Sequence, residues 1–408
     1  MYLNKNGKFL LMNFKLPKIT SLAFLISFGM VSLSTGASFF LIIYPFICNQ
    51  YEAHTILLPL TIAIFLVGKS LGSMISGFLS DAYGRRKVML LGLILFIFGN
   101  ILCFINYNIE FLVFGRFIQG LGANSYSIIG VAMIRDLYDG KFAAQTISRV
   151  GNIYVFSSAI VPIAAGYIAI YFSWRYTFFA MILLSGITLC TLIFMDESLP
   201  PEKRTKIKVE TILSDMMLIF SDKNYSFFNI QNALLSFGYQ CFYAISPLIY
   251  VKYFHIPVQH ITYYALIGSV LFVIGGLVNR LLIRFMSLIN VVRLGALFYT
   301  VGGGVFLYTV LAHPENALIQ RFGMGLSALA LGFVITNSIT LSQATLKSAY
   351  GLASSMRSVS SNMFMALGIY AFNYVAPASF VSLAYVYILT GLLSMVMMEL
   401  NKEKFIIT

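Results

Sequence analysis

The sequence predicts an all-α integral membrane protein whose twelve transmembrane helices form two pseudo-symmetric bundles of six. Three observations lead to this fold class. Hydrophobic residues make up 59% of the 408 residues and charged residues only 10%, which lies outside the usage of soluble proteins. Apolar runs of about 20 residues, long enough to cross a bilayer core of roughly 30 Å, recur along the chain. One long polar break separates them near the middle.

The twelve helices are placed in apolar stretches bounded by charged or turn-forming residues. Their expected ranges are 21–46, 56–80, 88–106, 111–133, 146–171, 175–195, 226–250, 261–283, 289–311, 317–340, 349–372 and 378–399. A chain inside lipid must satisfy its own backbone hydrogen bonds, which leaves helices or a closed barrel. The stretches are continuously apolar, whereas barrel strands alternate over about 10 residues, so a barrel is excluded.

Basic residues are distributed unevenly between the two sides of the predicted membrane. The loops on one side carry most of the 27 Lys and Arg, whereas the opposite side has Arg175 and Lys252. Loops rich in Lys and Arg face the cytoplasm, so we expect a multi-pass protein of the inner membrane with both termini cytoplasmic. The net charge of +13 therefore reports orientation, and nucleic acid is not an expected partner.

The polar break divides the chain into three parts. These are an N-terminal bundle with a cytoplasmic leader at 1–195, a cytoplasmic linker at 196–225 and a C-terminal bundle at 226–408. Within the linker, an amphipathic helix around Glu210–Phe220 is expected to lie along the membrane surface.

The two halves share a short sequence. Arg-Phe-x-x-Gly-Leu followed by a small residue begins at Arg116 in the fourth predicted helix and at Arg321 in the tenth. Because the two copies occupy matching places in their halves, they favour an internal duplication, an arrangement that many transporter folds use.

The loop between the second and third predicted helices has a distinctive pattern, G-x-L-x-D-x-x-G-R-R-K, at residues 77–87. Small residues allow close helix packing, an Asp at a helix end can pair with a base or cap a helix, and glycine permits a tight turn. The basic residues anchor the loop at the anionic cytoplasmic leaflet. The residues that carry these tasks are Gly77, Asp81, Gly84, Arg85 and Arg86.

This pattern resembles the cytoplasmic signature loop of the major facilitator superfamily, and within it the chain is most similar to the bicyclomycin/chloramphenicol-resistance (Bcr/CflA) group of drug–proton antiporters. Further similar segments are Arg116–Ala123, Arg135–Tyr138, Trp174–Arg175 and Ser246–Tyr250. The resemblance implies the superfamily fold, transport by rocking of two six-helix bundles, and export as the direction. It also implies that the loop at 77–87 latches the two halves together in the outward-facing state.

Two segments depart from that group. Its members usually carry an acidic residue in the first helix, where this chain has Ser38. Their fifth helix carries the motif G-x-x-x-G-P-x-x-G-G, of which this chain retains Pro162 and Gly166. These departures weaken the expectation of drug–proton antiport.

Four basic residues fall inside the predicted helices: Lys69, Arg116, Arg321 and Arg357. No acidic residue accompanies them there, and a charge inside a membrane is costly without a counter-charge. Lys69 lies roughly 18 Å deeper than Asp81 at ~1.5 Å per residue, near the midplane. An anionic substrate in a central cavity would supply the missing charge. Snorkelling to an interface is the alternative for Arg116 and Arg321. A second role for Lys69, compatible with anion binding, is to carry the coupling proton, because burial favours the neutral amine.

Several amides inside the predicted helices are candidates for hydrogen bonds to a substrate, with helix–helix contacts as the alternative. They are Gln119, Asn124, Gln240 and Asn337. The four Cys and four His form no metal-ligand spacing, and no nucleotide-binding loop is present, so no cofactor or metal is expected and the chain is not expected to be an enzyme.

These features together predict a secondary active transporter of a small organic, anionic solute such as a siderophore, metabolite or drug. Efflux is favoured, and import of a carboxylate-bearing solute or siderophore is the alternative. A non-transporting membrane sensor or assembly protein is the third possibility. A coupling proton or an exchanged solute would drive transport, and the protein is expected to work as a monomer in the lipid bilayer.

Overall fold

The computed structural model describes residues 18–51, 57–138, 140–204, 209–345, 350–375 and 379–401. Its helices are α1 (Lys18–Gln50), α2 (Leu57–Tyr83), α3 (Arg85–Ile105), α4 (Ile109–Ala123), α5 (Ser125–Leu137), α6 (Gly140–Tyr171), α7 (Tyr176–Ile193), the 3-10 turn η1 (Pro201–Lys203), α8 (Val209–Ser221), α9 (Lys223–Lys252), α10 (Val258–Leu282), α11 (Leu288–Ala312), α12 (Ala317–Gly323), α13 (Gly325–Gln343), α14 (Tyr350–Val375) and α15 (Phe380–Leu400). The cytoplasmic leader predicted at the start of the chain lies outside these residues.

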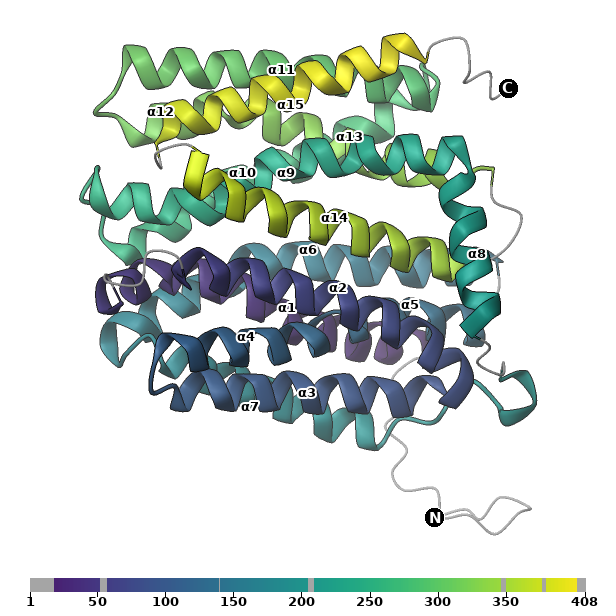
Figure 1. Cartoon of the computed structure of the whole chain (residues 1–408). Helices are drawn as coiled ribbons and strands as arrows, with labels where there is room; N and C mark the ends of the chain where they lie inside the picture. Colours follow the sequence, from purple (N-terminus) through teal and green to yellow (C-terminus); the bar gives the residue numbers. More distant parts are fainter. Residues whose placement is uncertain are drawn as a thin grey trace.

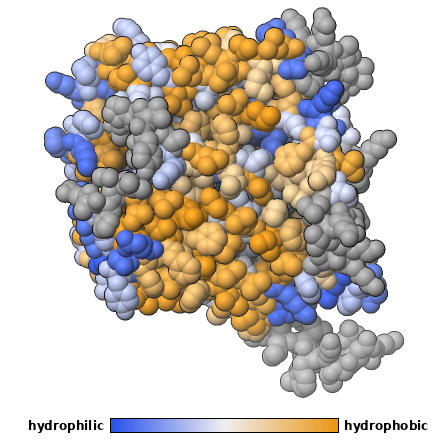
Figure 2. Space-filling view, in the orientation of Figure 1, coloured by the Kyte–Doolittle hydropathy of each residue, from blue (hydrophilic) through white to orange (hydrophobic). Residues whose placement is uncertain are grey.

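The helices run side by side in two groups, with α1 to α7 in one and α9 to α15 in the other (Figure 1). Ten spans in the described part of the chain are long and apolar enough to cross a membrane. The helices α6 and α14, with 32 and 26 residues, complete six crossings in each half. Figure 2 shows the result as a belt of apolar side chains between two polar ends. The twelve-helix, all-α prediction is therefore confirmed.

The linker contains the predicted amphipathic helix. It is α8, which lies across the ends of the membrane helices (Figure 1). Its Ile219 is buried against Tyr225 of α9 and Met356 of α14, whereas Met217 and Leu218 are exposed. This arrangement is typical of a helix that lies at a membrane interface.

Two predicted spans, 111–133 and 317–340, are observed as Ile109–Leu137 and Ala317–Gln343, and each is interrupted at a single residue. The fourth span breaks at Asn124, between α4 and α5, and the tenth breaks at Met324, between α12 and α13. Glycine and asparagine both weaken a helix interior; Gly122 lies just before the break at Asn124, and Gly323 and Gly325 flank the break at Met324. Asn124 and Met324 keep right-handed helical backbone angles, so each span continues in nearly the same direction. The matching breaks add to the similarity of the two halves.

The two halves contact each other at both ends of the molecule. The helices α2 and α14 pack together from the middle of α2, where Ser70 Oγ donates to the Val359 carbonyl at 3.4 Å, towards the α8 end, where Gly77 lies against Ser355. Towards the opposite end, α6 packs against α10, and the hydroxyls of Tyr167 and Tyr263 are hydrogen-bonded. The halves therefore pack against each other through α2 and α14 and through α6 and α10.

Candidate functional site

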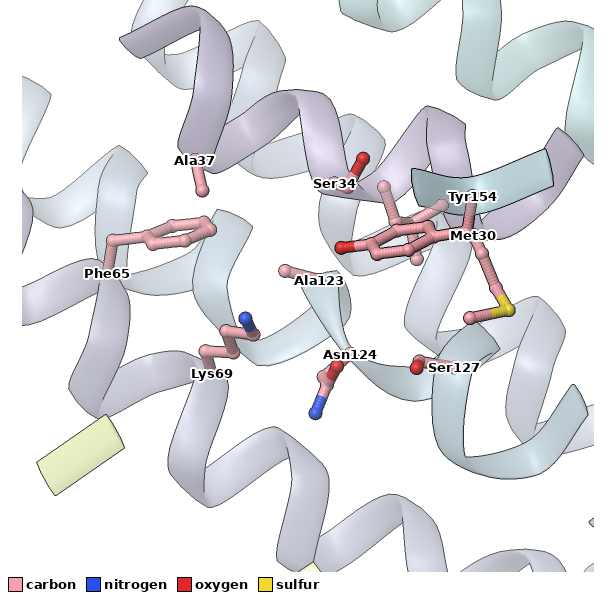
Figure 3. Close-up of a pocket in the computed structure, with 10 residues that line it drawn as sticks. Met30, Ser34, Ala37, Phe65, Lys69, Ala123, Asn124, Ser127 and Tyr154 are labelled. Atoms are coloured by element: carbon pink, nitrogen blue, oxygen red, sulfur yellow. The ribbon is translucent and has the colours of Figure 1, made fainter. Parts of the chain in front are cut away.

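A small cavity of about 60 Å³ lies inside the N-terminal half (Figure 3). Four spans contribute to it: Met30, Leu33, Ser34 and Ala37 from α1, Phe65 and Lys69 from α2, Ala123, Asn124 and Ser127 around the α4–α5 break, and Tyr154 from α6. The lining combines apolar and aromatic groups with a few polar ones, which is the usual composition of a small-molecule site. The volume holds a few water molecules but not a drug-sized ligand.

Lys69 is the charged residue of this lining. Its half-buried side chain directs the ammonium into the cavity, towards Phe65 and Ala123 (Figure 3). Among the described residues, no carboxylate or hydrogen-bond acceptor is recorded within bonding distance of the ammonium. The helices α2 and α4 pack closely at Lys69 and hold its backbone in place. A Cβ added to Gly120 of α4 would lie only 2.9 Å from the backbone nitrogen of Lys69.

The polar groups around Lys69 connect the cavity to the rest of the molecule. The Tyr154 hydroxyl is hydrogen-bonded to Ser34. Asn124 Nδ2 donates to Ser73 Oγ at 2.7 Å and to Ser358 Oγ of α14 at 3.1 Å. Asn124 therefore joins the cavity, the break in the fourth span and the opposite half of the molecule. The sequence prediction singled out Lys69 and Asn124, and the structure brings them together.

Arg116 lies in a packing site outside the lining of this cavity. Its guanidinium donates to the carbonyls of Gly36 (2.7 Å) and Thr61 (3.3 Å) and to the Gln119 side chain. The guanidinium carbon is 3.9 Å from the centre of the Phe40 ring and 4.1 Å from that of Phe65. Neutral acceptors and aromatic faces thus hold a fully buried cation.

Gln119 is part of the same network. Its Nε2 donates to Asn100 Oδ1 at 2.7 Å, and Asn100 Nδ2 donates to the Phe96 carbonyl at 2.8 Å. These contacts join α3 and α4 in the interior of the N-terminal half. A substrate contact for Arg116 or Gln119 stays a prediction, because their recorded partners are groups of the protein.

Arg321 has an equivalent environment in the C-terminal half. Its Nε donates to the Tyr264 carbonyl of α10 at 2.6 Å, and its guanidinium carbon lies 4.7 Å from the Phe242 ring of α9. Arg116 likewise donates to the second span of its half and stacks on a ring of the first. The shared Arg-Phe-x-x-Gly-Leu sequence therefore corresponds to a shared packing site, which supports the duplication predicted from the sequence.

The remaining predicted substrate residues lie in the C-terminal half. Asn337 is buried and donates to Asn279 Oδ1 at 2.7 Å, joining α13 to α10. Gln240 is half-buried in α9. Arg357 is half-buried in α14 near Tyr225, and its Nε has no hydrogen-bond partner among the described residues. None of the three lines the Lys69 cavity.

The two remaining residues of the fifth-helix motif lie in α6. Gly166 is buried there. The backbone of Pro162 is helical, and its side chain is outside the described part of the structure.

The loop motif at 77–87 forms an ionic cluster at the α8 end. Arg85 pairs with Asp81 and, through Nε at 2.9 Å, with Asp136 of α5. Gly84 has a positive φ of 105°, which favours glycine and allows the sharp turn between α2 and α3. Arg86 donates to the Ile193 carbonyl at the end of α7. These contacts join four spans within the N-terminal half.

Gly77 is the residue of the motif that faces the other half. A Cβ added to it would lie 3.0 Å from Ser355 Oγ of α14, so a small residue is needed for α2 and α14 to pack this closely. The ionic contacts of the motif lie within one half, and its role as a latch between the halves stays a prediction.

Glu197, at the start of the linker, completes the cluster, and the sequence prediction missed it. Its carboxylate accepts the backbone N–H groups of Arg85 (2.9 Å) and Arg86 (3.2 Å) at the first turn of α3. The carboxylate therefore caps the positive end of the helix dipole. The acidic pair Asp196-Glu197 at the start of the linker was the available signal, but the sequence does not show which helix Glu197 caps.

Removing this cap is expected to destabilise the protein. Glu197→Ala removes the acceptor of three backbone N–H groups, those of Arg85, Arg86 and Leu199, and we expect a loss of about 1–2 kcal/mol. Glu197→Gln keeps an acceptor and should lose about half of that. Thermal unfolding in detergent measures the effect, with exposed Glu202→Ala of η1 as the matched control. Equal melting temperatures for Glu197→Ala and Glu202→Ala would contradict the capping role.

Comparisons with known proteins agree with this fold and motif. The family model described as Major Facilitator Superfamily matches residues 26–369. The uncharacterized MFS-type transporter YdgK of Bacillus subtilis (strain 168) is 25% identical over 331 residues, covering 79% of this chain and 80% of the relative. The multidrug resistance protein MdtL of Citrobacter koseri (strain ATCC BAA-895 / CDC 4225-83 / SGSC4696) is 29% identical over 167 residues, covering 41% of this chain and 43% of the relative.

Solved structures show the same fold. The crystal structure of a D-xylose-proton symporter matches with a TM-score of 0.74 at 16% identity, over 93% of this chain and 97% of the symporter chain. The family match extends over most of both halves, and the relatives include a drug-resistance protein, as the motif resemblance implied. The chain is therefore a multi-pass membrane transporter that belongs to the Major Facilitator Superfamily.

Proposed function

We propose that the chain moves a small organic monoanion across the cytoplasmic membrane by alternating access, with export as the physiological direction. The observation that carries the proposal is the Lys69 ammonium in the cavity, which has no ion-pair or hydrogen-bond partner among the residues that the structure describes (Figure 3). A single fixed positive charge matches a single negative charge on the solute. The α8 end, which carries the basic loop motif, faces the cytoplasm in this arrangement.

The rest of the lining favours a solute with an apolar or aromatic body. Phe65 and Tyr154 offer ring surfaces, and Met30 and Leu33 are apolar. Ser34, Asn124 and Ser127 add a few hydrogen-bonding groups. A small aromatic carboxylate or sulfonate has this combination of one charged end and one apolar end.

The small volume and the contacts between the halves support a closed intermediate of the transport cycle. A site that opens alternately to each side passes through a state in which both sides are closed. A solute the size of a siderophore needs a larger opening than this state offers, so we favour a smaller anion.

Export is the direction that the relatives favour, because one of them is named a multidrug resistance protein. Import of the same anion is the second candidate. Two sequence features support it, namely Ser38 in place of the first-helix acid and the incomplete fifth-helix motif around Pro162. Uptake into right-side-out and inverted membrane vesicles, under pH gradients of each sign, distinguishes the two directions.

Replacing Lys69 by Met is expected to abolish anion binding. The probe is p-toluenesulfonate, which has one permanent negative charge and an aromatic ring. At roughly 100 times its Kd, it should stabilise the purified wild-type protein by about 2.7 kcal/mol. Loss of a charge-assisted contact should weaken binding about 10- to 100-fold in Lys69→Met. Thermal unfolding with and without the probe measures both effects.

Matched controls make this test specific. Lys223→Met removes an exposed lysine at the start of α9 and should keep the response. Lys69→Arg keeps the charge and should retain part of it. The neutral isostere p-toluenesulfonamide should not stabilise the wild type to the same extent. An equal response of Lys69→Met and wild type to p-toluenesulfonate and benzoate would refute the proposed role of Lys69.

A further inference from the structure

Among the residues that the structure describes, no Asp or Glu lies in the middle of a membrane-spanning helix. The acidic residues nearest to Lys69 along the sequence are Glu52 and Asp81, each of which lies outside or at the end of a membrane span. The sequences of α6, α9, α10 and α14 contain no Asp or Glu. Because rocking of the two halves rearranges the same helices, it brings no fixed negative charge to Lys69 in any state of the cycle.

The partners of the two buried arginines, Arg116 and Arg321, do not supply a negative charge either. The donors of Arg116 and Arg321 are directed at neutral carbonyls, a side-chain amide, a thioether and a hydroxyl. Both arginines therefore add to the positive potential inside the bundle. Ser34, Asn124, Ser127 and Tyr154, which line the cavity together with Lys69, are uncharged.

Because Lys69 is charged, the free energy of the closed state differs between the loaded and the empty transporter. A bound monoanion neutralises the ammonium while the cavity is closed on both sides. Without an anion, the same closed state encloses an uncompensated charge at low dielectric, which raises its free energy. The barrier for reorientation of the empty protein is therefore higher than that for the loaded protein.

We propose that the transporter is an obligatory anion exchanger. Because of Lys69, the protein reorients rapidly only while an anion is bound, both on the step that carries the solute out and on the return step. The inference rests on the proposed function, since it requires a monoanion at Lys69. It identifies the driving reaction as the counter-movement of a second organic anion rather than a proton taken up by a membrane carboxylate.

The test uses purified full-length protein in liposomes and labelled p-toluenesulfonate outside. This sulfonate stays ionised and carries no proton across the bilayer. One set of vesicles contains unlabelled p-toluenesulfonate, and the other contains dextran sulfate, a polyanion too large for the cavity. Potassium and valinomycin hold the voltage at zero in both sets. We expect uptake to be about 100-fold slower when no exchangeable anion is inside.

Variants and a second readout separate the possible results. Lys69→Met should lose both the stabilisation by the probe and the dependence on internal anion, whereas Lys223→Met should keep both. Wild-type protein that is stabilised by the probe but takes it up equally fast in both vesicle sets would overturn exchange and leave the proposed function intact. Uptake without internal anion, accompanied by proton movement, would likewise overturn exchange in favour of a cycle with neutral Lys69.

Absence of both stabilisation and uptake with p-toluenesulfonate and benzoate would overturn the proposed function, and exchange with it. Binding is measured independently of transport, so failure of the proposed function is distinguishable from failure of the exchange mechanism.

Discussion

Replacing Arg116 by Met is expected to destabilise the protein so strongly that little folded protein accumulates in the membrane. The variant removes the charge-assisted hydrogen bonds to the Gly36 and Thr61 carbonyls, which keep their helical N–H donors, and leaves the Gln119 oxygen without its donor in the interior of the N-terminal half. The unpaired Gln119 oxygen costs about 1–3 kcal/mol, and the two charge-assisted bonds and the stacking on Phe40 and Phe65 are lost as well. The sum of at least about 3 kcal/mol is a large part of the stability of a typical domain.

Size-exclusion chromatography and thermal unfolding of the detergent-solubilised protein measure this effect. Arg116→Lys keeps the charge but loses the planar fork of donors, so its stability should be intermediate. Arg284→Met, at an exposed position after α10, is the matched control and should behave as wild type. Folded Arg116→Met protein that has lost only its response to anions would instead support the substrate contact predicted from the sequence.

Replacing Gly120 by Ala is expected to separate α2 from α4 and to displace Lys69. A Cβ at this position would lie 2.9 Å from the backbone nitrogen of Lys69 and 3.1 Å from Gly68 Cα, and it would collide with the Phe65 carbonyl oxygen. All three contacts are with backbone, which cannot move without shifting a whole helix. Overpacking of this kind costs about 1–3 kcal/mol or more. Both the melting temperature and the stabilisation by p-toluenesulfonate should fall.

Gly186→Ala in α7 is the matched control, because a Cβ there meets no atom within 4 Å. Alanine is favoured over glycine in a helix by about 0.5–1 kcal/mol, so this variant should be slightly more stable than wild type. If Gly120→Ala also proved as stable and as responsive as wild type, α2 and α4 would not be packed as closely as the structure shows.

Much of the fold follows from the sequence because lipid restricts the choices. Inside a bilayer the backbone has no water to bind, so continuous apolar runs become helices with nearly the predicted limits. The second span was expected at 56–80 and is observed as α2, Leu57–Tyr83. The breaks at Asn124 and Met324 were missed, since each interrupts a continuous apolar span at a single residue and leaves its hydropathy unchanged.

The candidate site was less predictable. Lys69 and Arg116 look alike in the sequence, as basic residues inside apolar spans without acidic partners. The structure distinguishes them: Arg116 donates to carbonyls of its own half, whereas the Lys69 ammonium points into a cavity. Glu197 shows the same limit, because it caps α3 from a position 112 residues along the chain from Arg85.

The sequence by itself determined that this chain is a membrane-embedded, twelve-helix transporter with the basic loop motif on one side. Apolar length, charge distribution and a local motif are properties of neighbouring residues, and they can be read without knowing what packs against what. Only the tertiary structure decided which buried cations donate to groups of the protein and which one points into a cavity. That distinction depends on carbonyls, rings and helix contacts from distant parts of the chain, which come together when the helices pack.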